Sequence, residues 1–150
     1  MSIESDINQR KFRNEYQKAV INLIYTYNWV NEKSKLILEK GDVTGQQFNI
    51  LRILRGAGQP LSTLQIRQRM LDKMSDTSRI VDRLIVKGLA KKFICKNDKR
   101  LVDVIITEKG KKLLEKLDSY ENEMDGILGN LSEADAKTFN KLLDKIRNSN

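Results

Sequence analysis

The chain has 150 residues, the length of a single domain, and a formal net charge of +8. It contains one cysteine and no histidine, which excludes an internal disulfide and removes the commonest metal ligand and general base. No apolar run approaches the roughly 18 residues of a membrane span, and neither a secretory signal nor a nucleotide-binding or hydrolase motif is recognisable. These absences predict a cytoplasmic protein that is not an enzyme and uses no cofactor or metal.

The positive charge is concentrated in the middle of the chain. Residues 41–110 carry 14 basic and 7 acidic side chains, whereas residues 1–40 carry 7 and 5, and residues 111–150 carry 7 and 8. A basic middle between balanced ends is typical of a protein whose central part meets a polyanion. The central segment is therefore the candidate for nucleic-acid binding.

Apolar residues at spacings of three and four predict a long first helix from Ile7 to about Leu38, ended by Gly41. Thr44 is a suitable N-cap for a second helix, which the glycines at 56 and 58 close. Neither helix contains a proline. The first third of the chain is therefore expected to be helical.

Two shorter helices follow, separated by a tight turn. Ser62 or Thr63 can cap the third helix, which carries apolar residues as far as Leu71. Ser75 is then expected to cap a fourth helix that ends at Gly88. Two short helices joined in this way are typical of a helix-turn-helix.

The pattern becomes β-like at residues 91–96 and again at residues 101–107, with a hairpin tip at residues 97–100. Thr107 can cap a helix that runs from Glu108 to about Leu128, and Ser132 begins a last helix. The predicted order is α-α-α-α-β-β-α-α, a mainly α fold with a small β-hairpin.

The fourth helix is expected to have an apolar inside and a basic outside. At about 100° per residue, one arc holds Ile80, Val81, Leu84 and Ile85, and another holds Asp76, Arg79, Arg83 and Lys87. Arginine on a helix that enters the major groove either reads bases or grips phosphates. The hydroxyls of Ser75, Thr77 and Ser78, with the N–H groups of this helix end, can hold a phosphate. The alternative is a solvated basic face with an ordinary N-cap.

The hairpin adds a second basic feature directly downstream. From Arg79 to Arg100 there are eight basic residues and two acidic ones. A hairpin with Lys99 and Arg100 at its tip can reach the minor groove, whose negative potential attracts arginine. The alternative is a charged tip that only keeps an edge hairpin soluble.

Two further features invite functional interpretations. Cys95 is a candidate redox switch, although a free cysteine on a strand commonly behaves as a small hydrophobe. Tyr25, Tyr27 and Trp29 are candidates for an effector pocket, although aromatic residues on a long helix more often lie in a core or a dimer interface.

Five short motifs follow one another along the chain. In order they are VTGQQF at residues 43–48, SRIVDRL at 78–84, KGL at 87–89, DKR at 98–100 and ITEKG at 106–110. Each motif alone is weak, but five in this order and spacing are specific, and together they resemble the MarR family of bacterial winged-helix regulators. The resemblance covers essentially the whole chain.

The resemblance implies a winged helix-turn-helix with an intertwined helical dimerisation region. Residues 1–150 then form one domain, with residues 1–40 and 108–150 in the dimerisation region and residues 42–107 in the DNA-binding region. The family forms homodimers that place two recognition helices on a pseudo-palindromic operator. Its members usually repress transcription and release double-stranded DNA when a small phenolic or lipophilic effector binds.

The predicted DNA-binding residues combine the residue-level interpretation with the resemblance. They are Ser75, Asp76, Thr77, Ser78, Arg79, Arg83, Lys87, Lys99 and Arg100. Position within the family motif also implies that Asp98 orients the minor-groove arginine. The alternative function is a winged-helix module that binds protein without specific DNA binding.

Three residues depart from the family pattern. Arg67 stands where the third helix usually has a small residue, and it either contacts phosphate or only tilts that helix. Lys99 replaces the first arginine of the wing, and Lys96 stands where proline is common. The change at residue 99 preserves charge but loses bidentate geometry.

Overall fold

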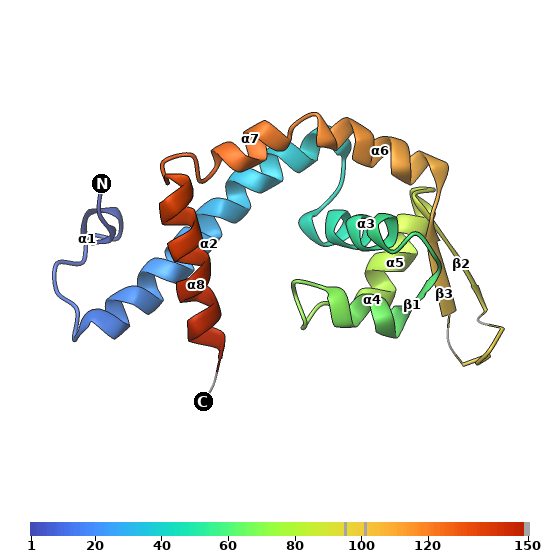
Figure 1. Cartoon of the computed structure of the whole chain (residues 1–150), viewed down its shortest axis with the longest axis horizontal. Helices are drawn as coiled ribbons and strands as arrows, with labels where there is room; N and C mark the ends of the chain where they lie inside the picture. Colours follow the sequence, from blue (N-terminus) through green and yellow to red (C-terminus); the bar gives the residue numbers. More distant parts are fainter. Residues whose placement is uncertain (95, 101, 149–150) are drawn as a thin grey trace.

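The computed structural model describes residues 1–94, 96–100 and 102–148, so Cys95, the candidate redox residue, lies outside the described part. Figure 1 shows an arch. Helix α2 (Glu15–Leu38) lies at one end, and a lobe of short helices and a small sheet lies at the other. Helices α6 (Glu108–Asp118) and α7 (Glu121–Gly126) connect the two ends across the top. The predicted class, mainly α with a β-hairpin, is confirmed.

The first long helix begins later than the apolar pattern predicts. A short helix α1 (Ile3–Asp6) comes first, Asn8 adopts a positive φ of 52°, and α2 starts only at Glu15. Asn14 caps α2, because its side chain accepts a hydrogen bond of 2.9 Å from the Gln17 amide. The predicted start at Ile7 is therefore wrong.

The end of α2 also differs from the prediction. A 3-10 turn η1 (Glu39–Gly41) follows, and the left-handed residue is Asp42, with φ 52°, rather than Gly41. Gly41 serves packing instead, since a Cβ there would lie 2.9 Å from Leu113 Cδ1 and 3.1 Å from both methyl groups of Leu117. The corner between α2 and α3 (Gly45–Ala57) thus packs directly against α6.

The lobe is built on three short helices: α3, α4 (Thr63–Arg69) and α5 (Thr77–Val86). Thr44 caps α3 as predicted, in a capping box with Gln47. The fully buried side chains at the centre of the lobe come from all three helices and from the sheet: Ile50, Leu51, Leu61, Ile66, Met70, Val81, Leu84 and Val104. Burial of these apolar side chains holds the helix-turn-helix of α4 and α5 in place.

The sheet has three antiparallel strands in the order β1-β3-β2, one more than the sequence predicts. The predicted hairpin corresponds to β2 (Ala90–Ile94) and β3 (Val102–Ile106). The added strand β1 (Leu61–Ser62) pairs with β3. Two residues are too few to show a β-period, so the pattern could not reveal this strand.

The predicted helix over residues 108–128 is interrupted. Thr107 caps α6 as expected, but α6 ends at Asp118 and α7 begins at Glu121. The Ser119 hydroxyl donates to the Lys116 carbonyl at 2.6 Å, which competes with the helical bonding pattern at the break. Ser132 caps α8 (Glu133–Arg147) as predicted. Within the described ranges, no helix is long and apolar enough to cross a membrane.

Candidate nucleic-acid interface

Helix α5 has the predicted inside and outside. Ile80, Val81 and Leu84 are buried, while Arg79 and Arg83 are exposed. Within the residues that the structure describes, neither guanidinium forms an ion pair. Two exposed arginines one turn apart on one helix face form a site for anions.

The start of α5 differs in detail from the prediction. The N-cap is Asp76, whose carboxylate accepts a hydrogen bond of 3.2 Å from the Arg79 amide. Ser75, the predicted cap, instead donates its hydroxyl to the Asp72 carbonyl at 2.7 Å. Ser78 is exposed, but Thr77 is buried, and its hydroxyl has no partner in the described part of the chain. Ser78 is therefore better placed than Thr77 to meet a ligand.

A groove of about 440 Å³ lies beside this helix end. Arg67 of α4 lines it together with Met74, Ser75 and Ser78. Arg67 is exposed. The arginine that departs from the family pattern is thus placed next to the start of α5, where an anion approaching the helix N-terminus would meet it.

The tip of the hairpin is locally ordered by Asp98. Its carboxylate accepts hydrogen bonds from the Arg100 amide at 3.0 Å and from Arg100 Nε and Nη2 at 3.1 Å each. These bonds lower the pKa of Asp98 below its ordinary value. The Arg100 side chain nevertheless stays 89% exposed. The Arg100 side chain is therefore both held in one direction and open to a partner. Lys99 beside it is also exposed.

The wing strand is also tied to the helix beside it. Lys92 Nζ of β2 lies 2.6 Å from Asp82 Oδ1 of α5. Both side chains are roughly half exposed. The ion pair therefore joins two surfaces that a DNA duplex would contact together.

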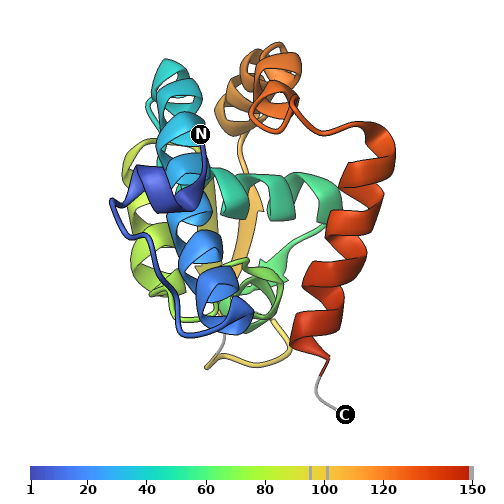
Figure 2. The same ribbon diagram turned by 90° about the vertical axis from the view of Figure 1, so that its left-hand side faces the viewer.

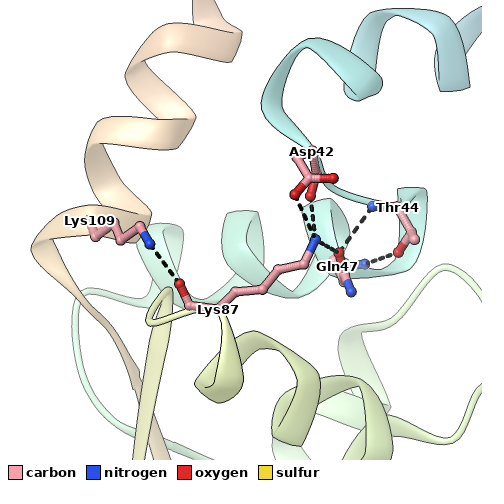
Figure 3. Close-up of polar contacts among 5 residues, drawn as sticks. All are labelled: Asp42, Thr44, Gln47, Lys87 and Lys109. Carbon is pink, nitrogen blue, oxygen red and sulfur yellow. Dashed lines mark hydrogen bonds and ion pairs between the residues drawn. The ribbon is translucent and has the colours of Figure 1, made fainter.

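Lys87 is another predicted DNA-binding residue that the structure places differently from the prediction. It follows the last residue of α5, and its ammonium donates to the Asp42 carbonyl and, at 3.3 Å, to Gln47 Oε1 (Figure 3). It points toward the corner between α2 and α3.

A cavity of about 870 Å³ lies at this corner, between α2 and the lobe. Tyr27 lines it, but Tyr25 and Trp29 are not among the wall residues found in the described chain. Other walls come from α2, the corner, α3, the loop after α4 and the end of α5: Asn31, Lys35, Asp42, Asn49, Met70, Asp72 and Lys87. Of the three candidate effector residues, the structure therefore brings only Tyr27 to this cavity.

Two helices at the other end of the arch, α2 and α8, carry exposed apolar side chains. Side chains of α2 and α8 contribute exposed residues: Tyr16, Val20, Leu23, Ile24, Tyr27, Leu142 and Ile146. Figure 2 shows α8 standing apart from α2, and no residue of α8 is buried. Exposed apolar patches of this kind mark interaction surfaces.

The fold and this basic surface define the class of the protein. A helix-turn-helix, a three-stranded sheet beside it and a basic hairpin make it a winged helix-turn-helix protein. No protein-family model matches the chain. The chain is, however, 29% identical over 129 residues to the multiple antibiotic resistance protein MarR of Salmonella typhimurium. The aligned residues cover 83% of this chain and 88% of that protein.

Solved structures agree with this relationship. The fold is similar to that of an E. coli MarR variant complexed with operator DNA, with a TM-score of 0.83 and 22% identity over 93% of this chain and 100% of that one. It is also similar to Bordetella bronchiseptica BpsR, whose DNA binding is regulated by 6-hydroxynicotinic acid. That match has a TM-score of 0.77 and 21% identity, and it covers 87% of this chain and 99% of the other. The chain is similar to MarR-type regulators in sequence and in fold, which agrees with the resemblance indicated by the five motifs.

Proposed function

We propose that the chain is a transcriptional regulator that binds double-stranded DNA of defined sequence as a homodimer. The observation that carries the proposal is the pair of exposed arginines on α5, without ion pairs in the described chain, beside a wing arginine held by Asp98. One element fits the major groove and the other the minor groove of the same duplex. The homologous regulators support this function.

The proposed contacts divide by role. Arg79 and Arg83 face the major groove from α5, and Arg100, with Lys99 beside it, reaches the adjacent minor groove. Ser75, Asp76, Thr77 and Ser78 form the helix start, where the exposed Ser78 meets a phosphate. Asp98 acts through Arg100 and touches no base. Residues 42–107 are the proposed DNA-binding region.

The proposed homodimer uses the apolar surface of α2 and α8. A helix with no buried residue in the monomer gains little from folding onto its own chain, so α8 requires a partner to bury its apolar stripe. A second copy of this surface supplies that partner with two-fold symmetry. Residues 1–40 and 108–150 are the proposed dimerisation region, and the dimer places two copies of α5 on one pseudo-palindromic site.

The corner cavity supports control by a small effector. Its mixed lining, with Tyr27 and Met70 beside Lys35 and Lys87, fits an aromatic or lipophilic molecule with a polar group. The BpsR homologue, regulated by 6-hydroxynicotinic acid, supports an effector of this size. We propose a repressor that acts in the cytoplasm, has no enzymatic activity and releases DNA when the cavity is filled.

A binding titration tests the proposal. The purified protein is titrated with DNA from just upstream of its own gene and with a scrambled duplex of equal length, at several salt concentrations. We expect a preference of about 10³ or more and a steep negative salt slope. Equal binding to both duplexes, in the range of roughly 10⁻⁴ to 10⁻⁶ M, would instead favour a winged-helix module whose partner is a protein.

A further inference from the structure

Lys87 joins three segments of the chain at the end of α5. Its ammonium donates to the Asp42 carbonyl and to Gln47 Oε1, and it lies 3.8 Å from the Asp42 carboxylate (Figure 3). The Lys87 carbonyl accepts a hydrogen bond of 2.9 Å from Lys109 Nζ of α6. The α2–α3 corner and the start of α6 therefore hold the same residue from two sides.

The neighbouring residue strengthens this junction. Gly88 adopts a positive φ of 74°, and its carbonyl accepts the Thr107 hydroxyl at 2.7 Å. The amides of Gly88 and Leu89 close the end of α5 by donating to the carbonyls of Ile85 and Leu84, each at 2.9 Å. Contacts with α6 and with the α2–α3 corner therefore set the position of the C-terminal end of α5.

Lys87 lies at the C-terminal end of α5, away from the helix N-terminus that is proposed to meet DNA. The helix has 10 residues, and at a rise of about 1.5 Å per residue its ends lie about 14 Å apart. Ser78 and Arg79, two of the exposed groups proposed to meet DNA, lie at the N-terminal end of the helix. The Lys87 side chain is only 33% exposed and already bonded within the protein. A phosphate contact would require it to give up these bonds.

We propose that Lys87 is a positioning residue rather than a DNA contact, and that it couples the corner cavity to the recognition helix α5. Lys87 and Asp42 both line that cavity, so an occupant that displaces either group also releases the end of α5. The proposal rests on the proposed function as a DNA-binding regulator. It replaces the direct DNA contact that the sequence predicts for Lys87.

The salt dependence of DNA binding separates the two roles. A lysine or arginine that neutralises a phosphate contributes about 0.9 to the slope of log affinity against log salt on B-DNA. Lys87→Met is therefore compared with Arg83→Met, using the upstream duplex. We expect both variants to bind more weakly, Lys87→Met by about threefold or more, but only Arg83→Met to lower the slope. An equal loss of slope in Lys87→Met would overturn the proposal.

A double-mutant cycle tests the bond to Gln47. Gln47→Glu keeps the acceptor that completes the Thr44 capping box and adds a charge facing Lys87. In the wild-type background we expect operator affinity to be retained. In the Lys87→Met background the introduced carboxylate is buried without a cation, and we expect a coupling of about threefold or more. Strictly additive effects would contradict the proposed link.

A measurement without DNA keeps the proposal independent of the operator. Hydrogen exchange of the Gly88 and Leu89 amides is followed in the free protein. We expect faster exchange in Lys87→Met and unchanged exchange in Arg83→Met. If the wild-type protein fails to prefer the upstream duplex, the proposed function fails. If these amides are unaffected by Lys87→Met, the positioning role fails whatever the protein binds.

Discussion

Arg55 of α3 and Asp118 of α6 form a bidentate ion pair, with Nη1 lying 2.7 Å from Oδ2 and Nη2 3.1 Å from Oδ1. The two residues are 63 positions apart in the sequence. The geometry matches the planar guanidinium to the planar carboxylate. The pair lowers the pKa of Asp118 and raises that of Arg55, because the hydrogen bonds between the two side chains, and then the attraction of their charges, favour the charged form of each. It is a direct link between the lobe and the helices that flank it.

This link predicts a pH-dependent stability. The folded-state pKa of Asp118 lies below its unfolded value, so its contribution is present above about pH 4 and is lost as the pH falls through the folded-state value. Water screens the pair, since the side chains are 35% and 38% exposed. Asp118→Asn should therefore lower the free energy of unfolding at pH 7 by only about 0.5 to 1 kcal/mol.

Urea unfolding of the wild type and of Asp118→Asn between pH 7 and about pH 2 measures this effect. The difference between the two proteins should shrink toward zero at the acid end. Asp125→Asn is the matched control, an exposed carboxylate for which no ion pair is found in the described chain. A difference that does not vary with pH would show that packing, and not the ion pair, is lost.

The two arginine elements should both be needed for operator binding. Arg83→Ala and Arg100→Ala should each weaken specific binding by about tenfold or more, because each removes an exposed guanidinium that faces DNA. The fold should be unchanged, as both side chains are exposed. The measurement is the same duplex titration, with circular dichroism to check folding.

The control for these variants is Lys112→Ala, which removes an exposed positive charge from α6. It should leave operator affinity within about twofold, since the charge lies outside the proposed interface. Full affinity in both arginine variants would show that the interface has been placed on the wrong surface.

For Asp98, the expected change in operator affinity is opposite to the change that charge alone would cause. Removing a carboxylate beside DNA should strengthen binding if charge alone decides. We expect Asp98→Ala to weaken operator binding instead, by about fivefold or more, because Arg100 loses the three bonds that set its direction. Asp98→Asn keeps one acceptor oxygen, and its operator affinity should lie between those of the wild type and of Asp98→Ala. An Asp98→Ala protein that binds more tightly would refute an orienting role.

The apolar stripe of α8 predicts the state of assembly. Replacing Leu142 and Ile146 together with glutamate should convert dimers to monomers, because these side chains are 54% and 70% exposed and need a partner surface. Light scattering after size exclusion gives the mass directly. Asn140→Glu, on the opposite side of the helix, should remain dimeric. A dimeric double variant would place the interface elsewhere.

Local sequence signals predicted much of this fold. Thr44, Thr107 and Ser132 each cap the helix that they were expected to cap, since a hydroxyl before an apolar periodic segment supplies a hydrogen-bond acceptor. The buried arc of α5 also follows from its period. Periodicity did not fix the start of α2, because the regular apolar spacing begins at Tyr16 and the side chain of Asn14, which caps the helix, decides where it starts.

The candidate site was less predictable where tertiary contacts decide the direction or the exposure of a side chain. The 100° rule places Lys87 on the same arc as Arg83, but the rule ends where the helix ends, and Lys87 follows the last helical residue. Its direction is set by Asp42 and Gln47, which are 45 and 40 positions away. Thr77 is buried for a similar reason, since its exposure depends on neighbours that no local pattern contains.

Ser62 belongs to two elements at once. It pairs with Asp103 in the sheet, and its hydroxyl accepts the Gln65 amide at 3.1 Å as the cap of α4. A rotation of the wing therefore carries the helix-turn-helix with it, and the lobe binds a duplex as one rigid unit. Operators whose half-sites differ in spacing or twist must then be accommodated by bending at the α2–α3 corner and α6, so mutations that relax spacing requirements should map there.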